Sequence, residues 1–264
     1  MTTKTKYLFL FLLGVSYSLN LSAQEIQRTF KWTYDGNLFT QTFTFRQSDY
    51  NYYRNLPKND KVFNYIKDHD NGHLYLLELA ETLDKYANAL EYTGHQLLEY
   101  LIAFVQQSTP YKTDPDMTAF GGGDYCKHPI ETLVENGGDC EDKAILLAAL
   151  LKMFEFDAIL LNLSRHYAIA ISCNGCSGSY YNYNGKKYYF IETTSIRKIG
   201  DIPDEYSFAY MTFEEIPNLV AYERKKLTKK ERRLYANTIE KTNQRQNGKT
   251  VYMRSRLALF PNAP

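Results

Sequence analysis

The first feature of the chain is an alternation of aromatic and polar side chains near its N-terminus. Between residues 25 and 47 the aromatic positions are Phe30, Trp32 and Tyr34, followed by Phe39, Phe43 and Phe45. A period of two is typical of a half-buried strand, and Asp35-Gly36-Asn37 between the two runs suits a tight turn. The pattern predicts a β-hairpin over 25–47, followed by a loop at 48–60.

Apolar residues then recur at helical spacing. The segment 74–90 shows this period, and Thr93 opens a second periodic stretch that runs to Val105. Both predict helices. The run Ala144–Leu151 is apolar on nearly every side, which predicts a buried central helix.

Three strand-like runs follow that helix, at 158–163, 167–171 and 187–194. Tyrosines flank the turn sequence Asn184-Gly185, so the last run is expected to belong to a hairpin. The segment 212–247 is expected to be helical. We find no internal repeat, and the mixture predicts an α+β fold with helices packed on one face of an antiparallel sheet.

The segment before the buried helix carries the candidate chemistry. It reads Asn136-Gly137-Gly138-Asp139-Cys140-Glu141-Asp142. The glycines allow a sharp turn, Asp139 is a good N-cap, and Asp142 falls three residues later, in the first turn. Cys140 would then be the first helical residue. Unpaired N–H groups and the helix dipole would lower the pKa of its thiol and favour the nucleophilic thiolate.

A cysteine nucleophile needs a base, and the chain contains five histidines. His166 is the best placed, because it opens the strand-like run 167–171 and would have a fixed backbone and a free ring. Glu192 ends the aromatic run of the next strand and would orient the imidazole, as the third member of a triad does. The alternative for Glu192 is a surface carboxylate, with Thr193 or Thr194 supporting the ring instead.

An oxyanion needs hydrogen-bond donors as well. The backbone N–H of Cys140 is one, and the side-chain amide of Gln106 or Gln107 is the candidate for the second. The alternative for both glutamines is a polar helix end. The chain has no nucleotide-binding loop, two-metal carboxylate cluster or cofactor-lysine motif, so we expect neither a cofactor nor a catalytic metal.

In this order the residues resemble the transglutaminase-like superfamily of papain-like cysteine enzymes, over about residues 104–203. The similarity is greater to its bacterial and archaeal proteins than to the animal cross-linking enzymes. Gly138-Asp139-Cys140-Glu141-Asp142 is the specific piece. The weaker pieces are Phe104-Val105-Gln106, Pro110-Tyr111, Pro129-Ile130-Glu131-Thr132-Leu133, His166-Tyr167-Ala168, Tyr188-Tyr189-Phe190-Ile191-Glu192-Thr193-Thr194 and Ile199-Gly200-Asp201-Ile202-Pro203.

The resemblance implies a transglutaminase-like core with a central nucleophile helix on an antiparallel sheet. In it Cys140 is the nucleophile, His166 the base and Glu192 the orienting acid, although many members carry Asp at the third position. Attack on a peptide or carboxamide carbonyl would form a thioester, which water or an amine resolves. We expect hydrolysis, because water is ubiquitous and no amine site is evident. The alternatives are a catalytically silent binding module for an envelope peptide or glycan, and a helper domain of an envelope assembly.

The N-terminus predicts export. Residues 1–23 have a basic start, a short apolar run and a small residue before the cut, which are typical of a secretory signal peptide. The apolar run is shorter than the roughly 20 residues that a membrane span needs. We expect a periplasmic or extracellular protein with no integral membrane segment after cleavage. The rest is expected to divide into an N-terminal hairpin with helices (24–100), a catalytic core (101–212) and a basic helical extension (213–264).

Charge narrows the range of partners. The chain has 31 basic and 30 acidic residues, a net charge of +1, which argues against nucleic acid. The expected partner is a peptide or protein substrate. Basic residues gather at 223–245, which indicates a solvated helix face, with contact to an anionic envelope component as the alternative.

Two of the four cysteines are close neighbours in the sequence. Cys173 and Cys176 would close a small loop as a disulfide, which an oxidising compartment favours. The alternative is a zinc site formed by these two with Cys126 and His128. The disulfide is favoured, because Cys126-Lys127-His128 lacks the usual spacing of a second zinc half-site.

Overall fold

The structure is a computed structural model that describes residues 24–57, 62–66, 71–113, 125–206, 211–217, 219 and 222–257. The predicted signal peptide, at 1–23, therefore lies outside the described residues. The elements in chain order are β1 (Glu25–Tyr34), β2 (Asn37–Arg46), α1 (Gln47–Arg54), α2 (Phe63–Ile66), α3 (Asn71–Ala89), α4 (Gly94–Ser108), α5 (Pro129–Glu135), α6 (Cys140–Met153), β3 (Asp157–Leu163), β4 (His166–Ser172), β5 (Tyr180–Tyr183), β6 (Lys186–Ile191), a short 3₁₀-helix (Asp204–Tyr206), β7 (Met211–Glu215) and α7 (Lys229–Leu257).

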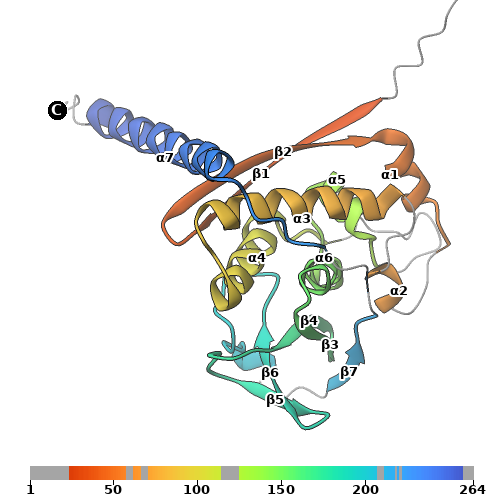
Figure 1. Cartoon of the computed structure of the whole chain (residues 1–264). Coiled ribbons are helices and arrows are strands. Elements are labelled where there is room, and N and C mark those ends of the chain that lie inside the picture. The colour runs from red at the N-terminus through yellow and green to blue at the C-terminus, as the bar shows by residue number, and fades with distance from the viewer. Residues whose placement is uncertain are drawn as a thin grey trace, which may run out of the picture.

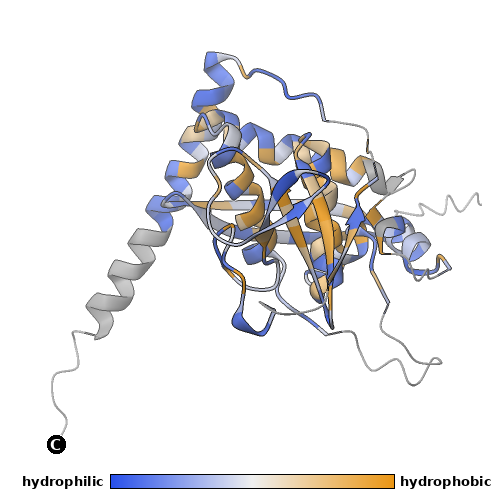
Figure 2. Cartoon of the chain, turned by 90° about the horizontal axis from the view of Figure 1, so that it is seen from below, coloured by the Kyte–Doolittle hydropathy of each residue, from blue (hydrophilic) through white to orange (hydrophobic). Residues whose placement is uncertain are grey.

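Helices α3, α4 and α6 lie between two antiparallel sheets. In Figure 1 the β1–β2 hairpin lies over α3 and α4, and α6 lies between these helices and the second sheet. That sheet has five strands in the order β5-β6-β4-β3-β7, all pairs antiparallel. Figure 2 shows apolar residues along α6 and the central strands, whereas the described part of α7 is largely hydrophilic. The predicted α+β class is confirmed.

The N-terminal hairpin forms as its sequence predicts. Asp35 and Gly36 both have positive φ, 49° and 72°, which is the backbone of the two-residue turn that matches strand twist. Alternation turns the aromatic side chains inward. Trp32 is 1% exposed, stacks on Phe39 with ring centroids 5.2 Å apart and meets Phe104 of α4 edge-on at 5.1 Å. The hairpin is thereby attached to the helical layer.

The predicted helices at 74–90, 93–105 and 144–151 are confirmed as α3, α4 and α6. Two other expectations are wrong. The predicted loop at 48–60 begins with helix α1, because Tyr53 is fully buried and Asp49 accepts hydrogen bonds from Arg46 and Tyr75. The predicted helix at 212–247 begins only at Lys229, because residues 211–215 pair with β3 as strand β7.

The boundaries of the predicted division of the chain lie inside secondary-structure elements. The boundary at 100/101 falls inside α4, and the boundary at 212/213 falls inside β7. Helix α4 packs on β1 at one side and on α6 at the other, so one hydrophobic core runs from the hairpin to α6. Within the described ranges, no helix combines the length and apolar character that a bilayer crossing requires.

Candidate active site

The turn before α6 is built around two glycines that no other residue could replace without rearrangement. Gly137 has φ +142°, and a Cβ there would lie 2.5 Å from the carbonyl oxygen of Pro110. A Cβ on Gly138 would lie 2.5 Å from the Asp142 carboxylate. The chain at Pro110–Lys112 pairs with Gly138 through backbone hydrogen bonds of 3.3 and 2.9 Å. This close approach brings Cys140 to the start of its helix.

Asp142 holds the first turn of α6 together. It completes a capping box with Asp139, as the sequence predicts. Its two carboxylate oxygens also accept from the backbone N–H and the ammonium group of Lys127, each at 2.7 Å. Asp142 and Lys127 are both almost fully buried. This ion pair fixes the segment that carries Cys126 against the nucleophile helix.

Cys140 is the first residue of α6, as predicted, but its thiol is not activated in the expected way. Burial raises the pKa of the Cys140 thiol well above its usual value, and the neighbouring carboxylate of Glu141 raises it further. The thiol donates to Glu141 Oε2 at 3.0 Å. The backbone N–H of Tyr167, which donates to the sulfur, acts to lower the pKa. The predicted lowering of this pKa is nevertheless wrong, because desolvation and the carboxylate of Glu141 have the larger effect.

His166 and Glu192 come together as the sequence predicts. His166 is the first residue of β4, and Glu192 follows the last residue of the neighbouring β6. His166 Nε2 lies 3.1 Å from Glu192 Oε2, and the residues are 5% and 1% exposed. Because Nε2 is engaged, Nδ1 is the ring nitrogen left for proton transfer. Cys140 contacts the backbone of Tyr167, the next residue along β4, so the thiol lies at the same strand end.

The carboxylate of Glu192 is held by its own chain. Oε1 accepts from the N–H groups of Thr193 and Thr194 at 2.9 and 2.8 Å, and from the Thr194 hydroxyl at 2.7 Å. Burial by itself would raise the pKa of Glu192, but His166 and Thr194 together keep this pKa below its usual value. Thr194 thus supports the carboxylate rather than replacing it.

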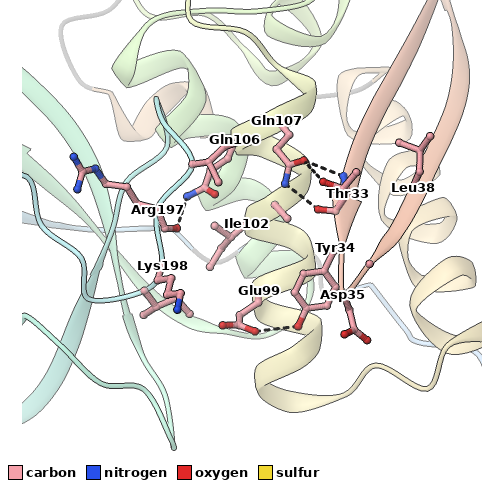
Figure 3. Close-up of a pocket in the computed structure, with 14 residues that line it drawn as sticks. Thr33, Tyr34, Asp35, Leu38, Glu99, Ile102, Gln106, Gln107, Arg197 and Lys198 are labelled. Atoms are coloured by element: carbon pink, nitrogen blue, oxygen red, sulfur yellow. Dashed lines mark hydrogen bonds between the residues drawn. The ribbon is translucent and has the colours of Figure 1, made fainter. Parts of the chain in front are cut away.

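Gln106 has a different role from the predicted one. Its amide Nε2 donates to the backbone carbonyl of Glu192 at 2.8 Å and to that of Arg197 at 3.0 Å, the second of which Figure 3 shows. Both amide hydrogens are thereby engaged, and neither is left for an oxyanion. Gln107 instead bonds both the N–H and the C=O of Thr33 in β1. We therefore assign Gln106 to positioning of the segment that carries Glu192.

Tyr206 is a site residue that sequence reasoning missed. Its ring stacks on the His166 imidazole with centroids 4.4 Å apart and planes inclined by 1°. Burial raises the pKa of Tyr206, and the charges of Glu192, Glu205 and Cys140 raise it further. In a chain with 24 tyrosines, nothing local distinguishes this one, so no sequence signal would have found it.

The sequence left two alternatives for Cys173 and Cys176, a disulfide and a zinc site. These two residues form the expected disulfide. His128 packs between Tyr53 and Tyr65, with ring centroids 5.0 and 4.9 Å away. Cys126 contributes to the raised pKa of Tyr167, beside Cys140. The zinc site proposed from these four residues is therefore wrong, because its two halves lie in different parts of the fold.

Comparison with known proteins adds little. No family model matches the chain, and no curated protein matches it. A solved structure described as "Crystal structure of a TGase" matches at 13% identity with a TM-score of 0.34. The match covers 69% of this chain and 47% of that chain, so the chain spans about half the length of the protein it matches. A TM-score at this level does not establish a shared fold.

Proposed function

We propose that this chain is a transglutaminase-like cysteine enzyme that acts on a peptide or carboxamide bond. The observation that carries the proposal is the buried pair of His166 Nε2 and Glu192 Oε2, 3.1 Å apart, at the strand end where Cys140 meets the backbone of Tyr167. A nucleophile on a helix N-terminus, a base and an orienting carboxylate are the three parts that thiol catalysis needs.

The proposed reaction begins with a rotation of the Cys140 side chain from Glu141 towards His166. Nδ1 of His166 takes the thiol proton, and Glu192 stabilises the imidazolium through Nε2. The sulfur attacks the carbonyl carbon, the imidazolium protonates the leaving amine, and a thioester remains. His166 then removes a proton from water, whose oxygen displaces the sulfur. An incoming amine in place of water would give a cross-linked product.

We favour hydrolysis and an exported site of action. Water needs no binding site of its own, whereas transamidation needs an amine pocket beside the thioester. Export rests on the signal-peptide pattern of residues 1–23. The expected substrate is therefore a peptide or protein outside the cytoplasm.

A thiol-directed activity probe tests this function. The wild type should be labelled at Cys140 and should release product from carboxamide or peptide substrates. His166→Asn should lower the rate by about 10²- to 10⁴-fold, which is the usual contribution of a general base. Cys126→Ser is the matched control, and circular dichroism verifies its fold. Labelling of Cys140 that is unchanged in His166→Asn would contradict a catalytic role for this pair.

A specific observation favours a second function, that of a silent binding module. The thiol is half-buried and donates to a carboxylate, so the resting form is the protonated and unreactive one. In that case the protein would hold an envelope peptide or glycan without turnover. A folded protein that binds peptides or glycans, but is not labelled by the probe in their presence, would favour this function.

A further inference from the structure

A second cluster of reactive side chains lies outside the proposed catalytic residues. His95 is in the first turn of α4, and Cys173 and Cys176 are in the loop between β4 and β5. Their ligand atoms all lie within 4.8 Å of one another, and the three residues are half-buried. Cys176 Sγ is 3.7 Å from His95 Nδ1. None of the three takes part in the proposed reaction.

We propose that these three residues bind a soft divalent metal ion of the Zn²⁺ type when the disulfide between the two cysteines is reduced. Thiolate and imidazole are the ligands that zinc prefers, and two cysteines separated by two residues form the usual half of a structural site. Gly175 lies between them with φ +84°, a backbone that suits the tight turn of such a loop. The inference is independent of the proposed enzyme activity.

The observed spacing suits coordination. With Zn–S about 2.3 Å and Zn–N about 2.0 Å, a sulfur and a nitrogen ligand of a tetrahedral ion lie about 3.5 Å apart. The Sγ–Nδ1 distance of 3.7 Å is close to this value. The two sulfur atoms must separate once the disulfide is reduced, and their Cα atoms are 5.8 Å apart in a three-residue step of the chain. Three protein ligands leave the fourth position for water.

His95 is also oriented as a metal-binding histidine is. Its Nε2 is 3.3 Å from Glu99 Oε1, one turn along α4. Glu99 Oε2 in turn accepts from the Tyr34 hydroxyl of β1 at 3.0 Å (Figure 3). A carboxylate on one ring nitrogen fixes the tautomer and points the lone pair of the other at the ion. Here that other nitrogen is Nδ1, which faces Cys176.

The disulfide and the metal are two exclusive states of the same three side chains. A dithiol reductant would give two electrons and two protons to the disulfide, forming two thiols and its own disulfide. The ion then displaces one proton from each thiol and is bound by two thiolates and neutral His95. In both states the loop is closed, but only the metal ties it to the start of α4.

Cobalt(II) is the probe for this site, because thiolate ligation produces charge-transfer absorption in the near ultraviolet. The full chain is reduced, freed of reductant under anaerobic conditions and titrated. Reduced wild type is expected to bind one Co²⁺ at least 100-fold more tightly than the variant Cys173→Ser/Cys176→Ser, and oxidised wild type is expected not to bind. Zn²⁺ should displace the cobalt. Equal binding by wild type and the double variant would overturn the proposal.

Two further variants test the histidine and its partner. His95→Ala should weaken binding by more than 10-fold, and Glu99→Gln by about 10-fold, the usual effect of losing an outer partner. The control is Cys126→Ser/His128→Ala, which should bind as the wild type does. Circular dichroism of each reduced variant verifies the fold. Wild-type affinity in His95→Ala, or loss of the fold when the wild type is reduced, would overturn the proposed site.

Discussion

At the residue scale, Glu141 decides the protonation of the Cys140 thiol. It is 6% exposed and accepts the thiol hydrogen of Cys140 at 3.0 Å. A carboxylate in this place repels a thiolate, so it keeps the sulfur protonated. Glu141 therefore acts against spontaneous alkylation and oxidation of the thiol.

Replacing Glu141 by Gln should make the Cys140 thiol more reactive. Without the carboxylate, the pKa of Cys140 should fall, and its alkylation by iodoacetamide at pH 7–8 should become about tenfold faster, since one pKa unit changes the thiolate fraction about tenfold. Mass-spectrometric mapping across pH measures the rate. Glu91→Gln, which removes a carboxylate on the surface paired with Arg232, is the control. A slower rate in Glu141→Gln would contradict this role.

Glu192 predicts a pH dependence of stability. Its pKa is lowered in the folded state, so its ionised form stabilises the fold above the unfolded value of about 4.3. This stabilisation is lost as the pH falls through the lower, folded value. The difference in unfolding free energy between wild type and Glu192→Gln should be largest near pH 6–7 and should shrink below about pH 4.3. Urea denaturation at several pH values measures it, and a difference that is constant with pH would refute it.

At the element scale, the first turn of α6 depends on the Asp142 carboxylate, which makes two kinds of contact. Asp142 caps the helix together with Asp139 and also neutralises the ammonium group of buried Lys127. Losing a cap alone costs about 1 kcal/mol. Losing one partner of a buried ion pair costs about 3–5 kcal/mol, because the other charge is left without compensation.

Substitutions of Asp142 and Asp139 should therefore have very different effects on the free energy of unfolding. Asp142→Asn is expected to lower the unfolding free energy by about 3–5 kcal/mol, whereas Asp139→Asn, which keeps a good N-cap, should lower it by under about 1 kcal/mol. Guanidinium denaturation followed by circular dichroism compares them. Similar losses in the two variants would show that the ion pair contributes little.

At the scale of the whole molecule, the hairpin and the nucleophile helix share one core. Trp32 contacts Phe104 of α4, and α4 packs directly on α6. Among the described residues, the hairpin and α6 therefore belong to one hydrophobic core. A shared core of this kind unfolds cooperatively rather than unit by unit.

The chain contains a single tryptophan, which makes this cooperativity measurable. Trp32 fluorescence reports on the hairpin, and the accessibility of Cys140 to a thiol reagent reports on α6. The two denaturation midpoints should coincide. Phe104→Ala should lower the free energy of unfolding by about 3–5 kcal/mol and move both midpoints together. Distinct midpoints would indicate two independently folding units.

The sequence by itself determined the features that depend on near neighbours. The hairpin follows from alternation around Asp35-Gly36, and the start of α6 follows from the glycines and the capping aspartates. The contact between His166 and Glu192 was also predictable, since each stands at the end of a strand-like run. In the hairpin and the helix start, a residue acts through its own backbone or through a position a few residues away, whereas His166 and Glu192 are 26 positions apart and meet because β4 and β6 pair.

Only the tertiary structure decided what depends on distant packing. Strand β7 exists because β3 offers a pairing edge, and Tyr206 reaches His166 from another part of the chain. His95 meets Cys176 across 81 positions of sequence. The protonation of Cys140 is of the same kind, because desolvation is a property of the finished core. Local pattern specifies conformation, whereas burial and long-range contact set the charge states on which the chemistry depends.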